Sequence, residues 1–341
     1  MYNRERIENH TTSEGFIVTE QGLWYAIDSY DELEPFLMSI VSPDDLWMFI
    51  SSTGSLTAGR KNADHALFPY CTSDKVTENY PTTGSHTIIR IDDNVWQPFS
   101  QGYAKNADIQ RTLYKHEAGN RIMFCEYHAS YHLEFRYAWA SSPRYGWVRS
   151  ASLRNASDYP RRIQILDGVQ NIVPANVTQK LQTNLSNLVD AYRLQELHEN
   201  KVATFGLTSY ICDRPQAHES LLVTSAWQSG LEAVEVLLSA EQVPTFYQTG
   251  TLKHEVRKEG VRGAFFCKAE FSLASEETRQ WMQVFEVDQA HGDVVNLLQL
   301  CKQPEKNLIE TVHLDIDNAT KKLLHLAALS DGLQATKDTM H

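Results

Sequence analysis

The chain has 341 residues, of which 42% are hydrophobic and 22% are charged. These proportions are typical of globular proteins and exclude disordered and fibrous classes, while the length suits one large domain with an appendage or two ordinary domains. The formal net charge is -12, and there is no dense block of lysine and arginine. Because such a surface repels phosphates, we expect no nucleic-acid partner, whereas neutral ligands such as sugars remain compatible with it.

Export and membrane insertion have no signal in the sequence. No apolar run is long enough to cross a bilayer, and the first residues, MYNRERIENHTTSEG, lack the apolar core of a secretion signal. The five cysteines are widely separated and include no CxxC pair, which is typical of reduced thiols. They are Cys71, Cys125, Cys212, Cys267 and Cys301. We therefore expect a cytoplasmic protein with no membrane partner.

A helix is predicted over residues 30–40, just before the most polar segment of the chain. That segment, residues 47–75, reads WMFISSTGSLTAGRKNADHALFPYCTSDK and is expected to form a largely non-periodic loop. Its polar residues lie between four aromatic ones: Trp47, Phe49, Phe68 and Tyr70. Loops of this composition are where a β scaffold commonly presents chemistry to a ligand.

Seven polar residues of this segment are candidates for ligand binding or for the wall of an active site. They are Arg60, Asn62, Asp64, His65, Tyr70, Asp74 and Lys75. The alternative is a surface loop in which these groups satisfy one another, because Asp and Asn often cap turns and Arg often pairs with a carboxylate.

Between Phe16 and Val287 the dominant period is two, which is typical of half-buried strands. The clearest strand is predicted over residues 132–139, where Leu133, Phe135 and Tyr137 share one face. Further strands are predicted at residues 87–91, 121–127, 146–153, 161–166, 204–210, 219–227, 264–269 and 281–287. Many antiparallel strands without regular helical crossovers predict two stacked sheets and not a doubly wound α/β fold.

Helices are sparse in this region. Residues 181–199 are the better candidate, because Leu181, Leu185, Leu188 and Tyr192 fall at helical spacing. A second helix is predicted over residues 231–239.

After Val287 the pattern becomes helical. A helix is expected to start at His291 with Asp293 as its cap and to end before Pro304. A longer helix follows over about residues 306–329, with apolar residues spaced three and four apart. These are Ile309, Val312, Ile316, Ala319, Leu323 and Leu326. This apolar seam either packs back on the sandwich or belongs to a connector whose other side docks on a domain outside this chain.

His128 and His132, with Glu126 and Glu134, are predicted to share one face of a strand. Residues four apart on a strand lie about 13 Å apart, so the two imidazoles cannot share one ion and we expect no metal site. The same four side chains could instead line a concave face that binds sugars.

Acid and base groups for sugar chemistry are present, but their spacing does not single out a pair. A mutarotase-like site would combine a histidine acid with a glutamate base. The candidates are His65, His128, His132, His218 and His254 with Glu126, Glu134 or Glu255. Glycoside cleavage requires suitably placed carboxylic acids, for which Asp64, Asp74 and Glu126 are candidates. The chain has no GxSxG, phosphate-loop, HExxH or dinucleotide motif, and we expect no cofactor.

Four segments of the chain carry a family resemblance. They are STGSLTAGRKNADHALFPY followed shortly by TSDK at residues 72–75, GWVRSASLRNASDYPRRIQILDGVQNIVP at residues 146–174, VRGAFF at residues 261–266, and LAALSDGLQATKD at residues 326–338. With them the chain, from about Phe16 to Asp338, resembles the amino-terminal part of the cellobiose and chitobiose phosphorylase family, glycoside hydrolase family 94, and its glycan-degrading relatives.

The resemblance implies a mainly β fold: a large two-layer antiparallel super-sandwich of the galactose-mutarotase type over residues 1–288, followed by a helical linker over residues 289–341. It further implies an (α/α)6 barrel, beyond His341, that holds the catalytic acid. The chain would then be catalytically incomplete alone and would contain no catalytic residue.

The same resemblance implies a role in a glycoside phosphorylase or hydrolase that acts on β-linked glucosides. Carbohydrate and the barrel would be its partners, and a homodimer is compatible with it. The sandwich would help to wall the active-site entrance, with residues 47–75 reaching toward it. A freestanding carbohydrate-binding module and a mutarotase- or epimerase-like enzyme are the alternatives.

Overall fold

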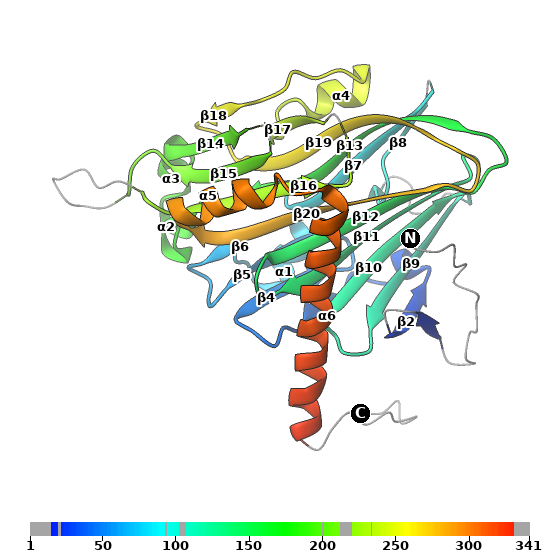
Figure 1. Cartoon of the computed structure of the whole chain (residues 1–341), viewed down its shortest axis with the longest axis horizontal. Helices are drawn as coiled ribbons and strands as arrows, with labels where there is room; N and C mark the ends of the chain where they lie inside the picture. The colour runs from blue at the N-terminus through cyan, green and yellow to red at the C-terminus, as the bar shows by residue number, and fades with distance from the viewer. Residues whose placement is uncertain are drawn as a thin grey trace.

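The structure is a computed structural model that describes residues 15–19, 22–92, 94–101, 107–199, 201–211, 220–232 and 234–330. Within these residues the chain forms twenty strands in three sheets, six α-helices and one short 3-10 helix. All strand pairs that these residues form are antiparallel, as the alternating sequence predicts (Figure 1).

One layer is a single sheet of eleven strands. In spatial order they are β1 (Phe16–Thr19), β2 (Gly22–Asp28), β9 (Ile109–His116), β10 (Arg121–His128), β11 (Leu133–Ser142), β12 (Gly146–Asn155), β20 (Thr278–Gln289), β16 (Val223–Ser229), β15 (Val202–Leu207), β14 (Arg193–His198) and β18 (Arg257–Glu259). The other layer contains a five-stranded sheet and a four-stranded sheet.

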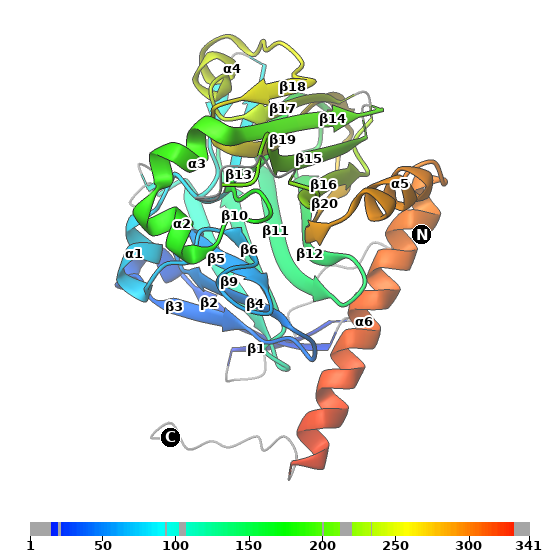
Figure 2. The ribbon, with the colours of Figure 1, turned by 90° about the vertical axis from the view of Figure 1, so that its left-hand side faces the viewer.

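The five-stranded sheet has the order β17 (Glu235–Ser239), β19 (Gly263–Leu273), β13 (Arg161–Ile172), β7 (Gly84–Ile91) and β8 (Asn94–Trp96). The four-stranded sheet has the order β3 (Leu37–Ile40), β4 (Leu46–Ser51), β5 (Leu56–Arg60) and β6 (Ala66–Phe68). Figure 2 shows both smaller sheets beside the large one.

One apolar core joins all three sheets. The large sheet contributes Phe135 and Phe285, the five-stranded sheet Ile165, and the four-stranded sheet Met48 and Phe68. Because alternate residues of a strand point to opposite faces, one face of the large sheet covers both smaller sheets. The predicted two-layer antiparallel architecture is therefore confirmed.

The helices lie at the edges and outer faces of this sandwich. They are α1 (Ser73–Glu78), α2 (Gln179–Asn184), α3 (Ser186–Tyr192), α4 (Val243–Thr249), α5 (His291–Leu300) and α6 (Glu305–Leu329). The predicted start of α5 is confirmed at His291, with one refinement. The Asp293 carboxylate lies inside the first turn and accepts a hydrogen bond from the Ala290 backbone N–H at 2.9 Å.

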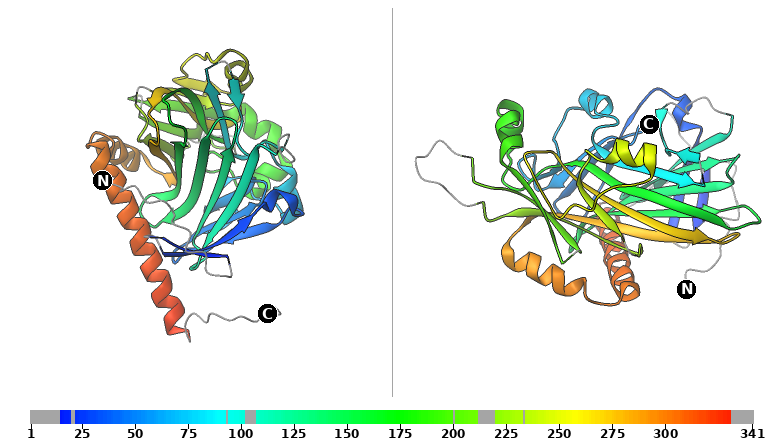
Figure 3. Two further views of the ribbon diagram at one scale, coloured as in Figure 1. Left: turned by 90° about the vertical axis from the view of Figure 1, so that its right-hand side faces the viewer. Right: turned by 90° about the horizontal axis from the view of Figure 1, so that it is seen from above.

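Helix α6 is docked along its first part and exposed along its last part. Leu308, Val312 and Ile316 are buried in an apolar cluster with Val148 and Val284 on the outer face of the large sheet. Figures 1 and 3 show the last turns of the helix leaving the body of the molecule.

The exposed part includes the end of the predicted seam. Leu326 is 44% exposed, and Leu329, which follows it on the same helix, is 71% exposed. Packing against the sandwich is therefore confirmed for the helix as far as Thr320 only.

Polar contacts hold the docked part of α6 against strand ends and loops of the sandwich. The Asp315 carboxylate accepts hydrogen bonds from Ser142 Oγ at 2.5 Å and from the Arg144 backbone N–H at 3.2 Å. Arg121 Nη2 lies 2.6 Å from Asp317 Oδ1. Lys322, the last of these anchors along the helix, pairs with Asp44 at 2.6 Å.

The prediction of a non-periodic loop at residues 47–75 was wrong. The segment contains most of β4, all of β5 and β6, and the start of α1. Strand β5 is buried on both faces from Leu56 to Gly59, so its sequence shows no alternation of apolar and polar residues.

Three predicted helices also differ from the structure. Residues 30–40 form a 3-10 helix (Tyr30–Glu32) and strand β3, because Pro35 interrupts the helical pattern. Residues 231–239 end in strand β17, which pairs with β19. Residues 181–199 are helical only to Tyr192, after which β14 pairs with β15 and β18.

Two strand predictions need smaller corrections. Strand β11 begins at Leu133, because His132 lies in a turn with a φ of 53°. The strand predicted over residues 219–227 is β16, which begins at Val223, and Glu219 lies outside the described residues.

Candidate functional site

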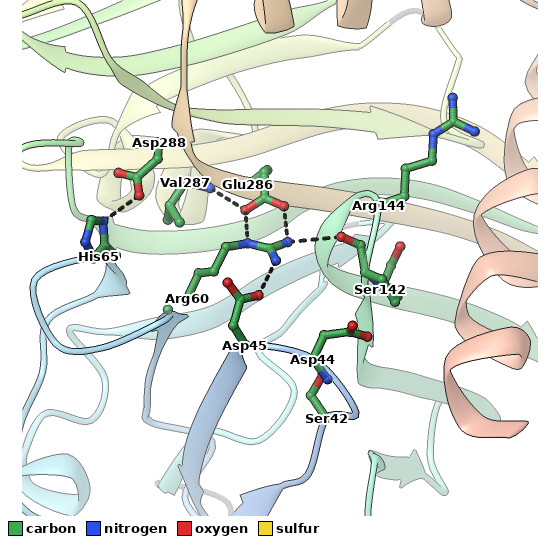
Figure 4. Close-up of polar contacts among 12 residues, drawn as sticks. Ser42, Asp44, Asp45, Arg60, His65, Ser142, Arg144, Glu286, Val287 and Asp288 are labelled. Atoms are coloured by element: carbon green, nitrogen blue, oxygen red, sulfur yellow. Dashed lines mark hydrogen bonds and ion pairs between the residues drawn. The ribbon is translucent and has the colours of Figure 1, made fainter. Parts of the chain in front are cut away.

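The seven predicted site residues lie in two places, one at the β5–β6 turn and the other after β6. Arg60, Asn62, Asp64 and His65 lie at or next to the turn between β5 and β6, which faces the end of β20 (Figure 4). Tyr70, Asp74 and Lys75 lie after β6, at or near α1. The structure therefore does not gather the seven into one site.

Arg60 is the centre of an ion-pair cluster at the β5–β6 turn. Its Nε and Nη2 donate to the two carboxylate oxygens of Glu286 at 3.2 and 2.6 Å, and its Nη1 donates to Asp45 at 2.5 Å. Nη2 also donates to the Pro143 carbonyl at 3.2 Å. Because all three nitrogens are engaged, this guanidinium fastens β5 to β20 and is not free to bind an anionic ligand.

The environment of this cluster changes the acidity of both partners. Burial lowers the pKa of Arg60, but the bonds to Glu286 and Asp45 raise it by more, so its pKa lies above the ordinary value. Burial raises the pKa of Glu286, and the Arg60 guanidinium offsets only part of that rise. Arg60 thus stays charged at any working pH.

His65 forms the second pair at this place. Its Nδ1 lies 2.5 Å from Asp288 Oδ2, and the imidazole is 34% exposed while the carboxylate is 18% exposed. Asp288 has a φ of 55°, which few residues other than glycine adopt. The strained residue follows Val287 at a register shift between β16 and β20, and such a bulge re-aims a side chain.

The other two turn residues have structural partners. Asn62 Oδ1 accepts a hydrogen bond from the Asp64 backbone N–H at 2.9 Å and so closes the turn. Asp64 Oδ1 accepts from the Gln179 backbone N–H at 2.8 Å, at the first residue of α2. A carboxylate at that position stabilises the helix start.

Tyr70 belongs to a group of exposed aromatic residues on the outer face of the four-stranded sheet. It is 41% exposed and meets Trp47 edge to face at 5.7 Å with an interplanar angle of 77°. Phe49 is 39% exposed and is tilted by 38° from Trp47. Rings at these angles do not make the flat platform that a carbohydrate-binding module would present, and Phe68 is buried in the core.

Asp74 and Lys75 are exposed residues of α1. Asp74 accepts a hydrogen bond from Thr72 Oγ1 at 2.6 Å, and this bond is the main cause that lowers the pKa of the carboxyl. Both residues lie in the first turn of the helix, where a carboxylate is favourable.

Of these residues, His65 is the one with chemistry to offer a ligand. A carboxylate bonded to Nδ1 fixes the orientation of an imidazole and leaves Nε2 as the nitrogen that can serve a sugar hydroxyl. Sequence reasoning missed both carboxylates that complete this place, Glu286 and Asp288. Glu286 and Asp288 alternate with the apolar residues Phe285 and Val287 at the end of β20. This pair of acidic residues in the strand could have marked them as candidates.

The other acid and base candidates do not form a sugar site of the predicted kind. Glu126 is fully buried and accepts hydrogen bonds from Trp96 Nε1, the Phe99 backbone N–H and Arg111 Nε at 2.6 to 2.8 Å. Burial raises the pKa of its carboxyl. His128 shares its face and packs edge to face against Trp96.

The prediction that Glu126, His128, His132 and Glu134 share one face was wrong. Glu126 is opposite Phe135 on the core-facing side of the large sheet, so Glu134, next to Phe135, points to the other side. Glu134 pairs there with Arg136 at 2.8 Å. His132, in the turn before β11, belongs to neither face.

The last candidates lie near β17. His254 Nδ1 accepts a hydrogen bond from the Val236 backbone N–H, and the Glu255 carboxylate accepts from the Leu238 and Ser239 backbone N–H groups. His218 lies outside the described residues.

The described residues contain neither a metal-ligand cluster nor a membrane-spanning helix. In the part of the chain that the structure describes, no three His, Cys, Asp or Glu side chains come together as metal ligands would. Across the same residues, no helix is both long enough and apolar enough to cross a membrane.

The chain is similar in structure to several solved proteins. No family model and no curated protein matches the chain. A bacterial glucoamylase complexed with acarbose is 9% identical with a TM-score of 0.49, and the match covers 84% of this chain and 37% of that one. A GalM/aldose epimerase homologue from C. elegans is 10% identical with a TM-score of 0.42, over 76% of this chain and 100% of that one.

A protein described as a kojibiose phosphorylase from the human microbiome is 9% identical with a TM-score of 0.38, over 89% of this chain and 31% of that one. This chain thus spans about a third of the glucoamylase and of the phosphorylase. Similarities this low assign no activity to the chain, and they do not single out the phosphorylase family that the sequence motifs resemble.

Proposed function

We propose that this chain is the β-sandwich and linker of a carbohydrate-active enzyme, a glycoside phosphorylase or hydrolase that acts on β-linked glucosides. In this proposal the chain does not catalyse the reaction alone. It supplies part of the active-site wall, takes part in contacts between two copies, and carries the linker to an (α/α)6 barrel.

The division of helix α6 into a docked and an exposed part carries this proposal. The part from Glu305 to Lys322 has the apolar packing and the anchoring pairs of a fixed element. Its last turns present Leu326 and Leu329 to solvent, at 44% and 71% exposure. Each buried CH2 group contributes about 0.8 kcal/mol, so a second domain that covered these side chains would be stabilised by them.

The loop residues have a limited part in this function. Arg60 and Glu286 hold the β5–β6 turn against β20, and this fixes the position of His65. His65 would then offer its Nε2 to a sugar hydroxyl at the entrance of the barrel. This is a positioning role, because the catalytic acid belongs to the barrel.

A mutarotase-like enzyme is the second candidate, because the partly exposed His65–Asp288 pair supplies a base and an acid of the kind that such an enzyme needs. Ring opening of an aldose requires an acid and a base that both reach the sugar. In this structure the two groups contact each other at 2.5 Å, so no sugar ring fits between them. The pair would have to open before it could act.

An assay of turnover tests the main proposal. The purified chain is incubated with cellobiose, with and without inorganic phosphate, and the products are followed by chromatography. We expect neither glucose 1-phosphate nor glucose above a blank without protein. Product formation by the wild type that disappears in the His65→Ala variant would overturn the claim that the chain is incomplete.

Polarimetry tests the second candidate on the same preparation. The chain is added to freshly dissolved α-D-glucose and to α-D-galactose, and the change in optical rotation is recorded. Acceleration that is lost in both His65→Ala and Asp288→Asn would establish the mutarotase, whereas an unchanged rate would exclude it for these sugars.

A further inference from the structure

A hollow of about 250 Å³ lies beside α4 on the outer face of the five-stranded sheet. Its lining residues are His86, Ile88, Gln97, Val243, Pro244, Tyr247 and Gln248. They come from β7, from the residue after β8, and from α4, which Figures 1 and 2 show at the edge of the molecule. The hollow is on a different sheet from the His65 pair.

Helix α4 is held firmly enough to shape this hollow. Phe246 is fully buried in an apolar cluster with Leu237 and Phe266. Arg90 Nη1 donates to the Tyr247 carbonyl at 2.7 Å, which joins the helix to β7. Gly250 ends the helix with a φ of 73°. Tyr247 is therefore presented at the rim by a fixed backbone, with its side chain 42% exposed.

The polar groups of the hollow are neutral and incompletely bonded to each other. His86 Nε2 and Gln97 Nε2 are 3.5 Å apart, which is a long contact for a hydrogen bond. Burial lowers the pKa of His86 to about 4, against an opposing effect of Asp167. At neutral pH the imidazole thus offers one donor and one acceptor, and each nearby glutamine offers both kinds of group.

We propose that this hollow binds a neutral, hydroxyl-rich ligand, such as a single glucoside unit. Paired donors and acceptors on His86, Gln97 and Gln248 match vicinal hydroxyl groups. Tyr247 and Pro244 supply apolar surface for the C–H face of a sugar ring.

Charge selects against the other classes of small ligand. None of the seven lining residues is an acid or a permanent base, so a charged ligand would lose its hydration without gaining a counter-charge. The net charge of -12 acts against anions in addition. The ligand class follows from this lining and does not depend on the proposed enzyme.

Binding of methyl β-D-glucoside to the full chain tests this inference. The imidazole and tyrosine signals are followed by NMR as the glucoside is added, with sodium glucuronate as the charged counterpart. We expect a Kd on the order of 1 to 10 mM, which is usual for a small ligand in a shallow site, and at least tenfold weaker binding of glucuronate.

Two variants locate the site, and one serves as the matched control. Tyr247→Ala removes an exposed ring, and Gln97→Leu removes an amide while keeping the volume; each is expected to weaken glucoside binding at least fivefold. Tyr159→Ala removes another exposed tyrosine, 45% exposed and located between β12 and β13, and should leave the Kd unchanged. Far-UV circular dichroism of each variant verifies that it is folded.

Three results would overturn the inference. They are no glucoside binding by the wild type, wild-type glucoside affinity in both Tyr247→Ala and Gln97→Leu, or a wild-type affinity for glucuronate equal to that for the glucoside. None of these results bears on turnover, so failure here is distinguishable from failure of the proposed function.

Discussion

Asp167 joins the two layers through hydrogen bonds of its side chain. It is fully buried on β13 and accepts two hydrogen bonds from Arg149 at 2.7 and 2.9 Å. Trp281 Nε1 and Thr87 Oγ1 each donate to it at 2.6 Å. The large sheet and the five-stranded sheet are thus joined by a satisfied, fully buried ion pair.

Removal of this carboxylate is expected to be severe. In the Asp167→Ala variant the Arg149 guanidinium is left buried without a counter-charge, which costs roughly 3 to 5 kcal/mol of unfolding free energy. Urea denaturation followed by tryptophan fluorescence measures the loss. The control is Glu276→Ala, which breaks the exposed pair with Arg154 and should cost less than about 1 kcal/mol. Equal losses in the two variants would contradict this account.

His86 is expected to make stability depend on pH in the acid range. Its pKa in the folded chain is about 4, below the ordinary value of 6.5. The unfolded chain therefore binds a proton between these two values while the folded chain does not, so stability falls as the pH drops from 6.5 towards 4. The full effect is roughly 3 kcal/mol, since each pKa unit corresponds to about 1.4 kcal/mol.

The measurement is the difference in unfolding free energy between wild type and His86→Gln at pH 7 and at pH 4.5. Because Gln97 and the rest of the sheet are common to both proteins, other titrating groups cancel in this difference. We expect the variant to lose less stability on acidification than the wild type. Parallel profiles would show that His86 is protonated as easily in the folded as in the unfolded chain.

The sequence pointed to the polar residues of the β5–β6 turn as candidates, but it could not predict their partner side chains in the fold. Arg60 and His65 meet Glu286 and Asp288, which lie more than 220 residues later in the chain. Their meeting depends on β20 lying beside this turn and on the bulge that turns Asp288. Neither condition is visible in local spacing.

At the scale of elements, a substitution at Gly59 tests the packing of the β5–β6 hairpin, and Gly292 in α5 provides a control glycine. A Cβ added at Gly59 would lie 2.4 Å from the His65 carbonyl oxygen and 2.7 Å from the Trp47 ring, so β5 and β6 would have to separate. A Cβ at Gly292, in the first turn of α5, would meet nothing within 4 Å.

We expect Gly59→Ala to destabilise the chain by roughly 1 to 3 kcal/mol, as overpacking does. Gly292→Ala should stabilise it by up to about 1 kcal/mol, because alanine loses less conformational freedom in a helix. Thermal denaturation of both variants compares them directly. A stable Gly59→Ala variant with an unshifted midpoint would mean that the hairpin is looser than the structure indicates.

Clear alternation made β11 predictable, whereas β5, which is buried on both faces, gave no such signal. Strand β11 alternates clearly, and its core-facing residues Leu133, Phe135 and Tyr137 are buried as predicted. Strands β14 and β17 depend on pairing with later segments of the chain, β14 with β18 and β17 with β19. Tertiary contacts override local preference in such segments.

At the scale of the whole molecule, composition and period were enough for the two-layer architecture. They were also enough for a terminal helix with one apolar side. The sequence could not predict where along that helix the packing stops, because Ile316 and Leu326 have equivalent places in the seam. The docked part ends with its partners Asp44, Arg121 and Ser142, whose positions are a property of the folded sheets.

The proposed linker requires that α6 is fixed to the sandwich as far as Thr320 and that this chain leaves its last turns uncovered. Hydrogen exchange of the isolated chain, read by mass spectrometry of peptic peptides, tests it most directly. We predict slow exchange from Leu308 to Ala319, where buried side chains and ion pairs hold the helix, and markedly faster exchange from Leu324 to Leu329. Equal protection along the whole helix would show that the chain itself covers the distal leucines, and it would contradict the linker.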